Sequence, residues 1–210
     1  MFARTCIVCD NTSNKRLVVS KVPYFQCESC KTLFSDPLPN EGMVGGGFEI
    51  ERNLYQNKER ISRVEKMFGK AAVNVLDFGC GHGLLVADLI SNGYNATGYD
   101  AYNPKFTKKP PKETFELVMA VEVVEHLSYP FYEFDFINRC LKPGGIFYIE
   151  TSFVNVAEEE EIPLEDFEYI SPSVGHSTIF SHHGLDLILA LKGFVPQHHI
   201  NRHVRLYRKK

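Results

Sequence analysis

The sequence has no long apolar run. Its longest runs, such as Leu117–Val121, fall far short of the roughly 20 residues that a membrane-spanning helix needs. The first residues, Met1–Arg4, contain no hydrophobic signal region, so we expect no signal peptide. Both observations predict a soluble, cytoplasmic protein without a membrane span.

The sequence also lacks a large excess of either charge. It holds 23 Lys and Arg against 26 Asp and Glu, which gives a formal net charge of −3. Domains whose whole surface grips nucleic acid are usually strongly basic, so this balance argues against a nucleic acid partner. Hydrophobic residues make up 44% of the 210 residues, which excludes wholesale disorder and allows a core.

Two Cys-x-x-Cys pairs, Cys6/Cys9 and Cys27/Cys30, stand near the start. The 17 residues between them are typical of a tetrahedral four-cysteine zinc site. Without a secretion signal, thiols stay reduced, which favours metal ligands over disulfides. The alternatives are a remnant that has lost its metal and a redox-active pair, although no thioredoxin-like context is present. A closed zinc site would do no chemistry and would stabilise a segment too small to hold a core.

The composition divides the chain into three parts. Residues 1–36 form a zinc-ribbon-like segment, and residues 37–47, with two prolines and four glycines, form a linker. Residues 48–210 form the main domain, which begins with a predicted helix over 48–69.

From residue 73 onward, strand-like and helix-like stretches alternate. This alternation predicts an α/β fold with a doubly wound, mostly parallel sheet. The predicted strands are Val73–Phe78, Tyr94–Tyr99, Phe115–Val121, Ile146–Thr151, Phe194–Ile200 and Val204–Arg208. The predicted helices are Leu84–Asn92, Phe131–Leu141 and His182–Leu191, and residues 152–180 are expected to be irregular.

A glycine-rich turn, Gly79-Cys80-Gly81-His82-Gly83, follows the first predicted strand. Glycines there permit a tight turn and let a ligand approach the backbone beside a helix N-terminus. The spacing is GxGxG rather than GxGxxG, and Asp77 stands two residues before the turn. A carboxylate at that place would repel a pyrophosphate, so a ligand with an ammonium group suits the turn better.

Asp100 ends the second predicted strand, where a carboxylate can accept hydrogen bonds from both hydroxyls of a ribose. Together with the segment FELVMAVEVVEH at 115–126 and LKPGG at 141–145, these motifs resemble those of class I S-adenosylmethionine-dependent methyltransferases. The E-V-x-E-H segment is similar to that of the ubiquinone-biosynthesis methyltransferases. A zinc-ribbon-like segment before such a domain also resembles sugar C-methyltransferases and some ribosomal-RNA methyltransferases.

The resemblance implies a seven-stranded, Rossmann-like sheet, with S-adenosylmethionine as cofactor and S-adenosylhomocysteine as product. It also implies that Asp100 holds the ribose, with Ala101 and Tyr102 beside the adenine, and that Val121 and Glu122 line the floor near the methyl group. The residues implied around the methionine and ribose parts are Asp77, Gly79, Cys80, Gly81 and Gly83.

The segment after Asp100 departs from the family pattern. Only 14 residues separate Asp100 from Phe115, and three of them are proline. The family has a helix and a strand there, so we expect one crossover helix to be lost or reduced to a turn. Glu113 and Thr114 are then substitute candidates for recognising the adenine.

Methyl transfer needs a base only when the acceptor must lose a proton. Glu122 and His126 lie at the end of the third predicted strand, on the sheet edge that faces the ligand crevice in open α/β folds. His126 titrates near neutrality and suits a base, although it can equally shape the loop or position the substrate. Glu125 and His176 are further catalytic candidates. The acidic run at 158–168 is either a lid for a cationic acceptor or a solvated loop, and we favour the loop.

The leading hypothesis is a methyltransferase that acts on a small molecule, such as a sugar, a quinone-like compound or a secondary metabolite. One alternative is an RNA methyltransferase whose cysteine segment grips RNA. That segment has five Lys or Arg against three acids, and this net positive charge is small for a surface that binds a phosphate backbone. A further alternative is a non-catalytic, zinc-bearing interaction protein. The sequence predicts no particular oligomeric state.

Overall fold

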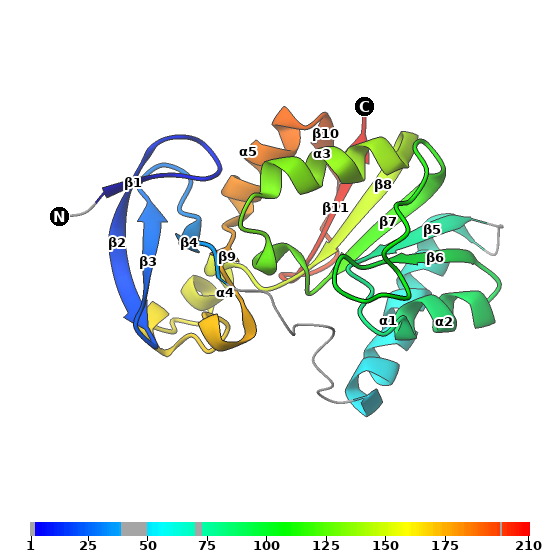
Figure 1. Ribbon diagram of the computed structural model, residues 1–210, viewed down its shortest axis with the longest axis horizontal. Coiled ribbons are helices and arrows are strands. Elements are labelled where there is room, and N and C mark those ends of the chain that lie inside the picture. The colour runs from blue at the N-terminus through cyan, green and yellow to red at the C-terminus, as the bar shows by residue number, and fades with distance from the viewer. Residues whose placement is uncertain (1–2, 39–49, 70–72, 198) are drawn as a thin grey trace.

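The computed structural model describes residues 3–38, 50–69, 73–197 and 199–210, with side chains from residue 55 onward in the first helix. The predicted linker lies outside the described residues except for Pro37 and Leu38. The chain forms two sheets, which lie toward opposite ends of the long axis of the molecule, with α3 and α5 along one side (Figure 1).

The larger sheet has the order β10-β11-β8-β7-β5-β6. Strands β6, β5, β7 and β8 run parallel to one another. Strand β11 pairs with β8 in antiparallel fashion, and β10 pairs with β11 in the same way. The predicted α/β fold class is therefore confirmed, with six strands in the described part of the chain instead of seven. These strands are β5 (Asn74–Phe78), β6 (Asn95–Tyr99), β7 (Phe115–Val121), β8 (Leu141–Glu150), β10 (Phe194–Pro196) and β11 (Val204–Lys209).

The strand that is missing would follow β6, where residues 101–114 fold into turns. The backbone N–H of Asp100 donates to the carbonyl of Phe106 at 3.1 Å, and the N–H of Phe106 donates to that of Asn103 at 2.9 Å. The ring of Phe106 then packs against Gly98 of β6 and Gly83. The prolines disfavour a regular element here, and the ring of Phe106 covers Gly83 and Gly98.

Helices cover both faces of this sheet. Side chains alternate along each strand, so Val75 and Leu117 face α1 and α2, whereas Leu76 and Val118 face α3 and α5. The helices are α1 (Ile50–Phe68), α2 (Leu84–Ser91), α3 (Pro130–Cys140), α4 (Val154–Glu159) and α5 (His182–Leu191), with short 3-10 helices at Val124–His126, Leu164–Asp166 and Pro172–Val174. None of the helices in the described residues has both the length and the apolar character to cross a bilayer.

The smaller sheet belongs to residues 3–36, which we call the cysteine module. Its strands are β1 (Ala3–Thr5), β2 (Thr12–Val19), β3 (Val22–Cys27) and β4 (Leu33–Ser35), and its fifth strand is β9 (Thr178–Ile179). Because β9 comes from the main domain, the two parts share a sheet, and Figure 1 shows β4 and β9 side by side. Buried residues of the module and of the α3/α5 face form one continuous hydrophobic cluster.

The acidic segment is more ordered than the sequence predicts. Residues 152–180 contain α4 and two of the short 3-10 helices instead of irregular chain throughout. Glu160 pairs with Arg202 at 2.5 Å, and Glu165 pairs with Arg16 of the cysteine module at 2.9 Å. The remaining acids are mostly exposed, in keeping with the solvated loop that the sequence favours.

Candidate active site

The glycine turn lies at the carboxyl end of β5, in contact with the loop that follows β7. Gly79 has a φ of +77°, and a Cβ there would come within 2.5 Å of a methyl group of Val123. Only glycine fits both the left-handed backbone and this contact. The turn and the Glu122–His126 segment are therefore neighbours, as the parallel order of β5 and β7 requires.

Asp100 lies at the end of β6 and is engaged by backbone amides. One carboxylate oxygen accepts from Gly81 at 2.9 Å, and the other accepts from Tyr102 at 2.8 Å and Asn103 at 2.9 Å. A carboxylate offers about four lone-pair sites, so about one is left for a ligand. The carboxylate therefore faces the glycine turn, and its role in holding a ribose stays a prediction.

Asp77 is buried at the end of β5, with 4% of its surface exposed. Burial raises its pKa to about 7, against the opposing effect of the Arg60 charge. Arg60 of α1 is itself buried and binds Glu150 at 2.7 Å. A cation brought to Asp77 would restore its ionised form.

The other residues predicted around the cofactor have mixed surroundings. The open side of Gly83 is filled, because a Cβ there would meet the ring of Phe106 at 2.6 Å. Cys80 is half-buried, and burial raises its thiol pKa to about 12. Ala101 and Tyr102 are exposed, and Val121 is half-buried.

A cavity of about 410 Å³ lies away from this chemistry. It is lined by residues such as Asn74 and Thr97, near the amino ends of β5 and β6, with Phe115 at the start of β7. Among the predicted site residues, only Thr114 lines it, and Thr114 precedes β7, at the opposite end of that strand from the carboxyl edge. We place the candidate site by the convergence of acidic and histidine side chains at the carboxyl edge, where open α/β sheets bind their ligands.

Glu122 and Glu125 share one tyrosine, Tyr169. Its hydroxyl lies 3.0 Å from a carboxylate oxygen of Glu122 and 2.7 Å from one of Glu125, whose second oxygen accepts from Thr151 at 2.9 Å. Glu125 is fully buried, and burial raises its pKa. Glu122 is exposed and has a φ of +51°, a left-handed conformation that costs a non-glycine residue energy and clusters at functional sites.

The two candidate histidines face each other beside this acid pair. The rings of His126 and His176 have centroids 4.9 Å apart, and burial lowers the pKa of both. Nδ1 of His176 lies 2.7 Å from the carbonyl oxygen of Tyr169. A carbonyl only accepts, so Nδ1 carries the proton and Nε2 of the neutral ring is free to accept one.

His126 presents a second unusual group. Its Nδ1 is buried and has no hydrogen-bond partner among the described residues. Ligand atoms of Glu125, His126 and His176 lie within 4.8 Å of one another, a donor set that also suits a divalent cation. The site therefore combines groups that can take up a proton with groups that can bind positive charge.

The structure brings four predicted catalytic candidates into one cluster: Glu122, Glu125, His126 and His176. It adds Tyr169 and Thr151, which the sequence analysis missed. Thr151 directly follows β8, so its position at the carboxyl edge was a usable signal. Tyr169 lies in a segment without periodicity, so the sequence contains no usable signal for it.

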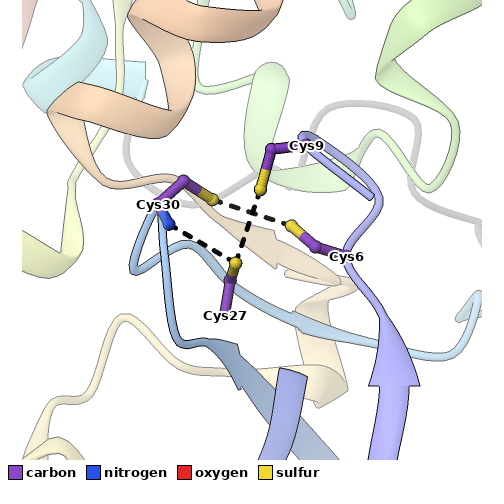
Figure 2. A group of neighbouring side chains, drawn as sticks. All are labelled: Cys6, Cys9, Cys27 and Cys30. Carbon is purple, nitrogen blue, oxygen red and sulfur yellow. Dashed lines mark hydrogen bonds between the residues drawn. The ribbon is translucent and has the colours of Figure 1, made fainter. Parts of the chain in front are cut away.

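The four cysteines of the module converge (Figure 2). Sγ of Cys6 lies 3.6 Å from that of Cys30, and Sγ of Cys9 lies 3.5 Å from that of Cys27. Each pair joins two different turns, and all four are free thiols. The hydrogen bond from Cys6 lowers the pKa of Cys30 to about 5, which favours a thiolate.

The family model described as "Methyltransferase domain" matches residues 49–199. The chain belongs to the methyltransferase-domain family. It contains the glycine turn, the acid pair and both histidines within the matched range.

Curated relatives of this methyltransferase-domain protein include ubiquinone biosynthesis O-methyltransferases. The one from Pseudomonas aeruginosa is 26% identical over an alignment of 118 residues, with 45% of this chain and 51% of the relative covered. The one from Caulobacter vibrioides is 30% identical over an alignment of 105 residues, with 38% of this chain and 40% of the relative covered. The chain thus matches about half the length of these relatives or less.

Solved structures share the fold. The 1,6-didemethyltoxoflavin-N1-methyltransferase of Burkholderia thailandensis, solved with S-adenosylhomocysteine, has a TM-score of 0.56 at 14% identity and covers 94% of this chain and 99% of its own. A protein from Pyrococcus horikoshii has a TM-score of 0.58 at 15% identity, covering 77% of this chain and 93% of its own. These likenesses confirm the predicted class I methyltransferase fold.

Proposed function

We propose that the protein is an S-adenosylmethionine-dependent methyltransferase that acts on a small-molecule acceptor of the sugar, quinone-like or secondary-metabolite type. The main support is the pair of carboxylates, Asp77 and Asp100, buried at the carboxyl ends of neighbouring strands on either side of the glycine turn. Family membership and the printed activities of the ubiquinone-biosynthesis and toxoflavin enzymes support it, whereas another relative, 39% identical over 64 residues, is a tRNA (uracil-O(2)-)-methyltransferase of Schizosaccharomyces pombe.

The residues present fit the cofactor. Asp77, a buried acid whose pKa burial raises to about 7, gains by meeting the cationic methionine end. The free lone pair of Asp100 suits one ribose hydroxyl, and exposed Ala101 and Tyr102 stand next to it for the adenine. Val121 and Glu122 would form the floor, next to Val123, which contacts Gly79. When bound, the cofactor supplies the methyl group and the leaving thioether.

The chain would contribute alignment and proton uptake. Holding the acceptor in line with the methyl group can lower the barrier by several kcal/mol. His176 is the base that we favour, because its Nδ1–H is fixed by the carbonyl of Tyr169 and its Nε2 is free. His126 and Glu122 then orient the acceptor beside it, and an acceptor hydroxyl would pass its proton to Nε2 as the methyl–oxygen bond forms.

Zn²⁺ suits the four-cysteine cluster. Zinc–sulfur bonds of about 2.3 Å in a tetrahedron separate the sulfurs by about 3.8 Å, close to the 3.5 and 3.6 Å of the two pairs. Cys6, Cys9, Cys27 and Cys30 would hold the ion, which stabilises the module and takes no part in methyl transfer.

The test is binding of S-adenosylhomocysteine by calorimetry, followed by mass spectrometry of small molecules that co-purify with the chain. We expect saturable binding with one ligand per chain. Absence of binding by a folded protein would reject the proposed activity and leave the non-catalytic alternative. For the RNA alternative, Arg4 and Arg16 of the module are already paired with Asp36 and Glu165, which further weakens a phosphate-binding surface.

A further inference from the structure

Residues 176–179, which we call the bridging segment, lie between the cysteine module and the candidate active site and bind both. Ser177 illustrates the arrangement. Its N–H donates to the carbonyl of Glu125 at 2.9 Å, and its own carbonyl accepts from the N–H of Ser35 at 2.9 Å. One residue, Ser177, therefore lies between Glu125 of the acid pair and β4 of the module.

The two neighbours of Ser177 repeat this pattern. Thr178 pairs with Phe34 of β4, and its hydroxyl donates to the carbonyl of Leu127 at 2.8 Å. The carbonyl of His176 accepts from the hydroxyl of Tyr24, in β3, at 2.6 Å. Three consecutive residues are thus each held from the module side and from the site side, and Figure 1 shows β9 in that position between them.

The cysteine cluster is tied to the same region. The hydroxyl of Ser181, which caps α5 two residues after the bridging segment, donates to the carbonyl of Cys30. Gly184 of α5 faces Thr32 so closely that a Cβ would come within 2.0 Å of the Thr32 hydroxyl. The turn that holds Cys27 and Cys30 therefore rests on the first turn of α5.

We propose that Tyr24 is a positioning residue of the methyl-transfer site: from the cysteine module it fixes the backbone of His176 and so holds that ring against Glu125 and His126. The inference rests on the proposed function, because His176 matters only if the site handles an acceptor. The four-cysteine cluster is then the anchor that keeps Tyr24 and β4 in register. The module is one wall of the site.

The surroundings of Tyr24 suit this role. The residue is completely buried, so its hydroxyl has no water with which to exchange its bond to His176. Burial raises its pKa to about 12, which keeps the hydroxyl a donor at ordinary pH. Without the Tyr24 hydroxyl, the carbonyl of His176 loses the hydrogen bond from the module. Among the described residues, no other side chain of the module donates to it.

The experiment compares Tyr24→Phe with Tyr132→Phe, which removes a hydroxyl from an exposed residue of α3. The readout is solvent exchange of the proton on Nδ1 of His176 by NMR, assigned through its loss in His176→Asn. Amide exchange at 176–178 and in β7 is followed in parallel. We expect Tyr24→Phe to speed exchange at His176 and at 176–178 by about fivefold, the equivalent of one hydrogen bond, with β7 unchanged.

A chelator that removes Zn²⁺ from the wild-type chain is the second perturbation, and we expect it to act in the same direction. Equal exchange in Tyr24→Phe and Tyr132→Phe would overturn the proposal. Uniform acceleration that includes β7 would also overturn it, because that result means a general loss of stability. Binding of S-adenosylhomocysteine is measured on every variant: if the wild type does not bind, the proposed function fails while the exchange data still decide the role of Tyr24.

Discussion

The main domain and the cysteine module are held together in different ways. The domain buries large apolar side chains on both faces of a six-stranded sheet, so its strands and helices support each other. The module has four short strands, borrows a fifth from residues 178–179, and gathers four cysteines at one end. On our proposals, a metal at the four cysteines and the domain would together order the module, and the segment that the module holds would in turn order the domain's active-site cluster.

Loss of the cysteine cluster should have the largest effect, because the module depends on it more than the domain does. Cys27→Ser, or removal of Zn²⁺, should unfold the module and lower the free energy of unfolding by several kcal/mol, since a structural zinc site contributes folding free energy directly. Thermal unfolding and elemental analysis measure this effect. Cys80→Ser, outside the cluster, is the control. Less than about half a zinc per purified chain would count against the site.

Asp100→Asn tests the domain side without touching the module. The substitution removes a charge that binds three backbone amides, and hydrogen bonds to charged groups are worth about 1.5–3 kcal/mol each. We expect affinity for S-adenosylhomocysteine to fall by about 100-fold. Asp166→Asn, in the exposed acidic segment, is the matched control and should bind normally. Calorimetry that finds equal affinities for the two variants would show that Asp100 does not hold the ligand.

The sequence was informative where chemistry depends on local spacing. The cysteine pairs, the glycine turn and Asp100 carry their signal within a few residues, because a tight turn or a metal knuckle restricts the residue types it accepts. The structure brought the cysteines together and put Asp100 beside Gly81. The loss of the crossover after β6 was also predictable from three prolines in 14 residues.

Contacts between distant segments could not be predicted in this way. Strand β9 has two residues, too few to show any periodicity, and it forms because β4 offers an open edge. Tyr169 reaches Glu125 across 44 residues, and Arg60 reaches Glu150 across 90. Such side chains are placed by packing of whole elements, which no local pattern encodes.

Gly83→Ala sharpens the account of the shortened crossover. Gly83 and Gly144 have similar positive φ values, 79° and 76°, but only Gly83 faces the ring of Phe106, whereas Gly144 has open space around it. Gly144→Ala should cost about 1 kcal/mol from backbone strain. Gly83→Ala should cost about 2 kcal/mol, because the ring must also move. Denaturant unfolding measures both, and adding Phe106→Leu should recover part of the difference. Equal costs would mean that Phe106 does not pack firmly against Gly83.

The smallest expected effect concerns Asp77 and pH. Its carboxyl is neutral below a pKa of about 7 and ionised above it, and a cationic ligand prefers the ionised form. Affinity for S-adenosylmethionine should therefore rise from pH 6 to pH 8, by about tenfold, because about one tenth of the chains carry the charge at pH 6. Binding at pH 6 should also release a proton, which calorimetry in buffers of different ionisation enthalpy detects.

The variant Asp77→Asn separates the titration of Asp77 from the titration of the ligand. The ligand titrates in the same way with the wild type and with the variant. The variant should bind more weakly at pH 8 and lose most of the change between pH 6 and pH 8. Chelation of Zn²⁺ should leave the pH dependence of Asp77 intact, since Asp77 lies on β5, whose neighbours β6 and β7 belong to the main sheet. A pH dependence that persists in Asp77→Asn would assign the titration to another group. A pH dependence that disappears when the metal is removed would mean that the module affects the cofactor side of the site as well as His176.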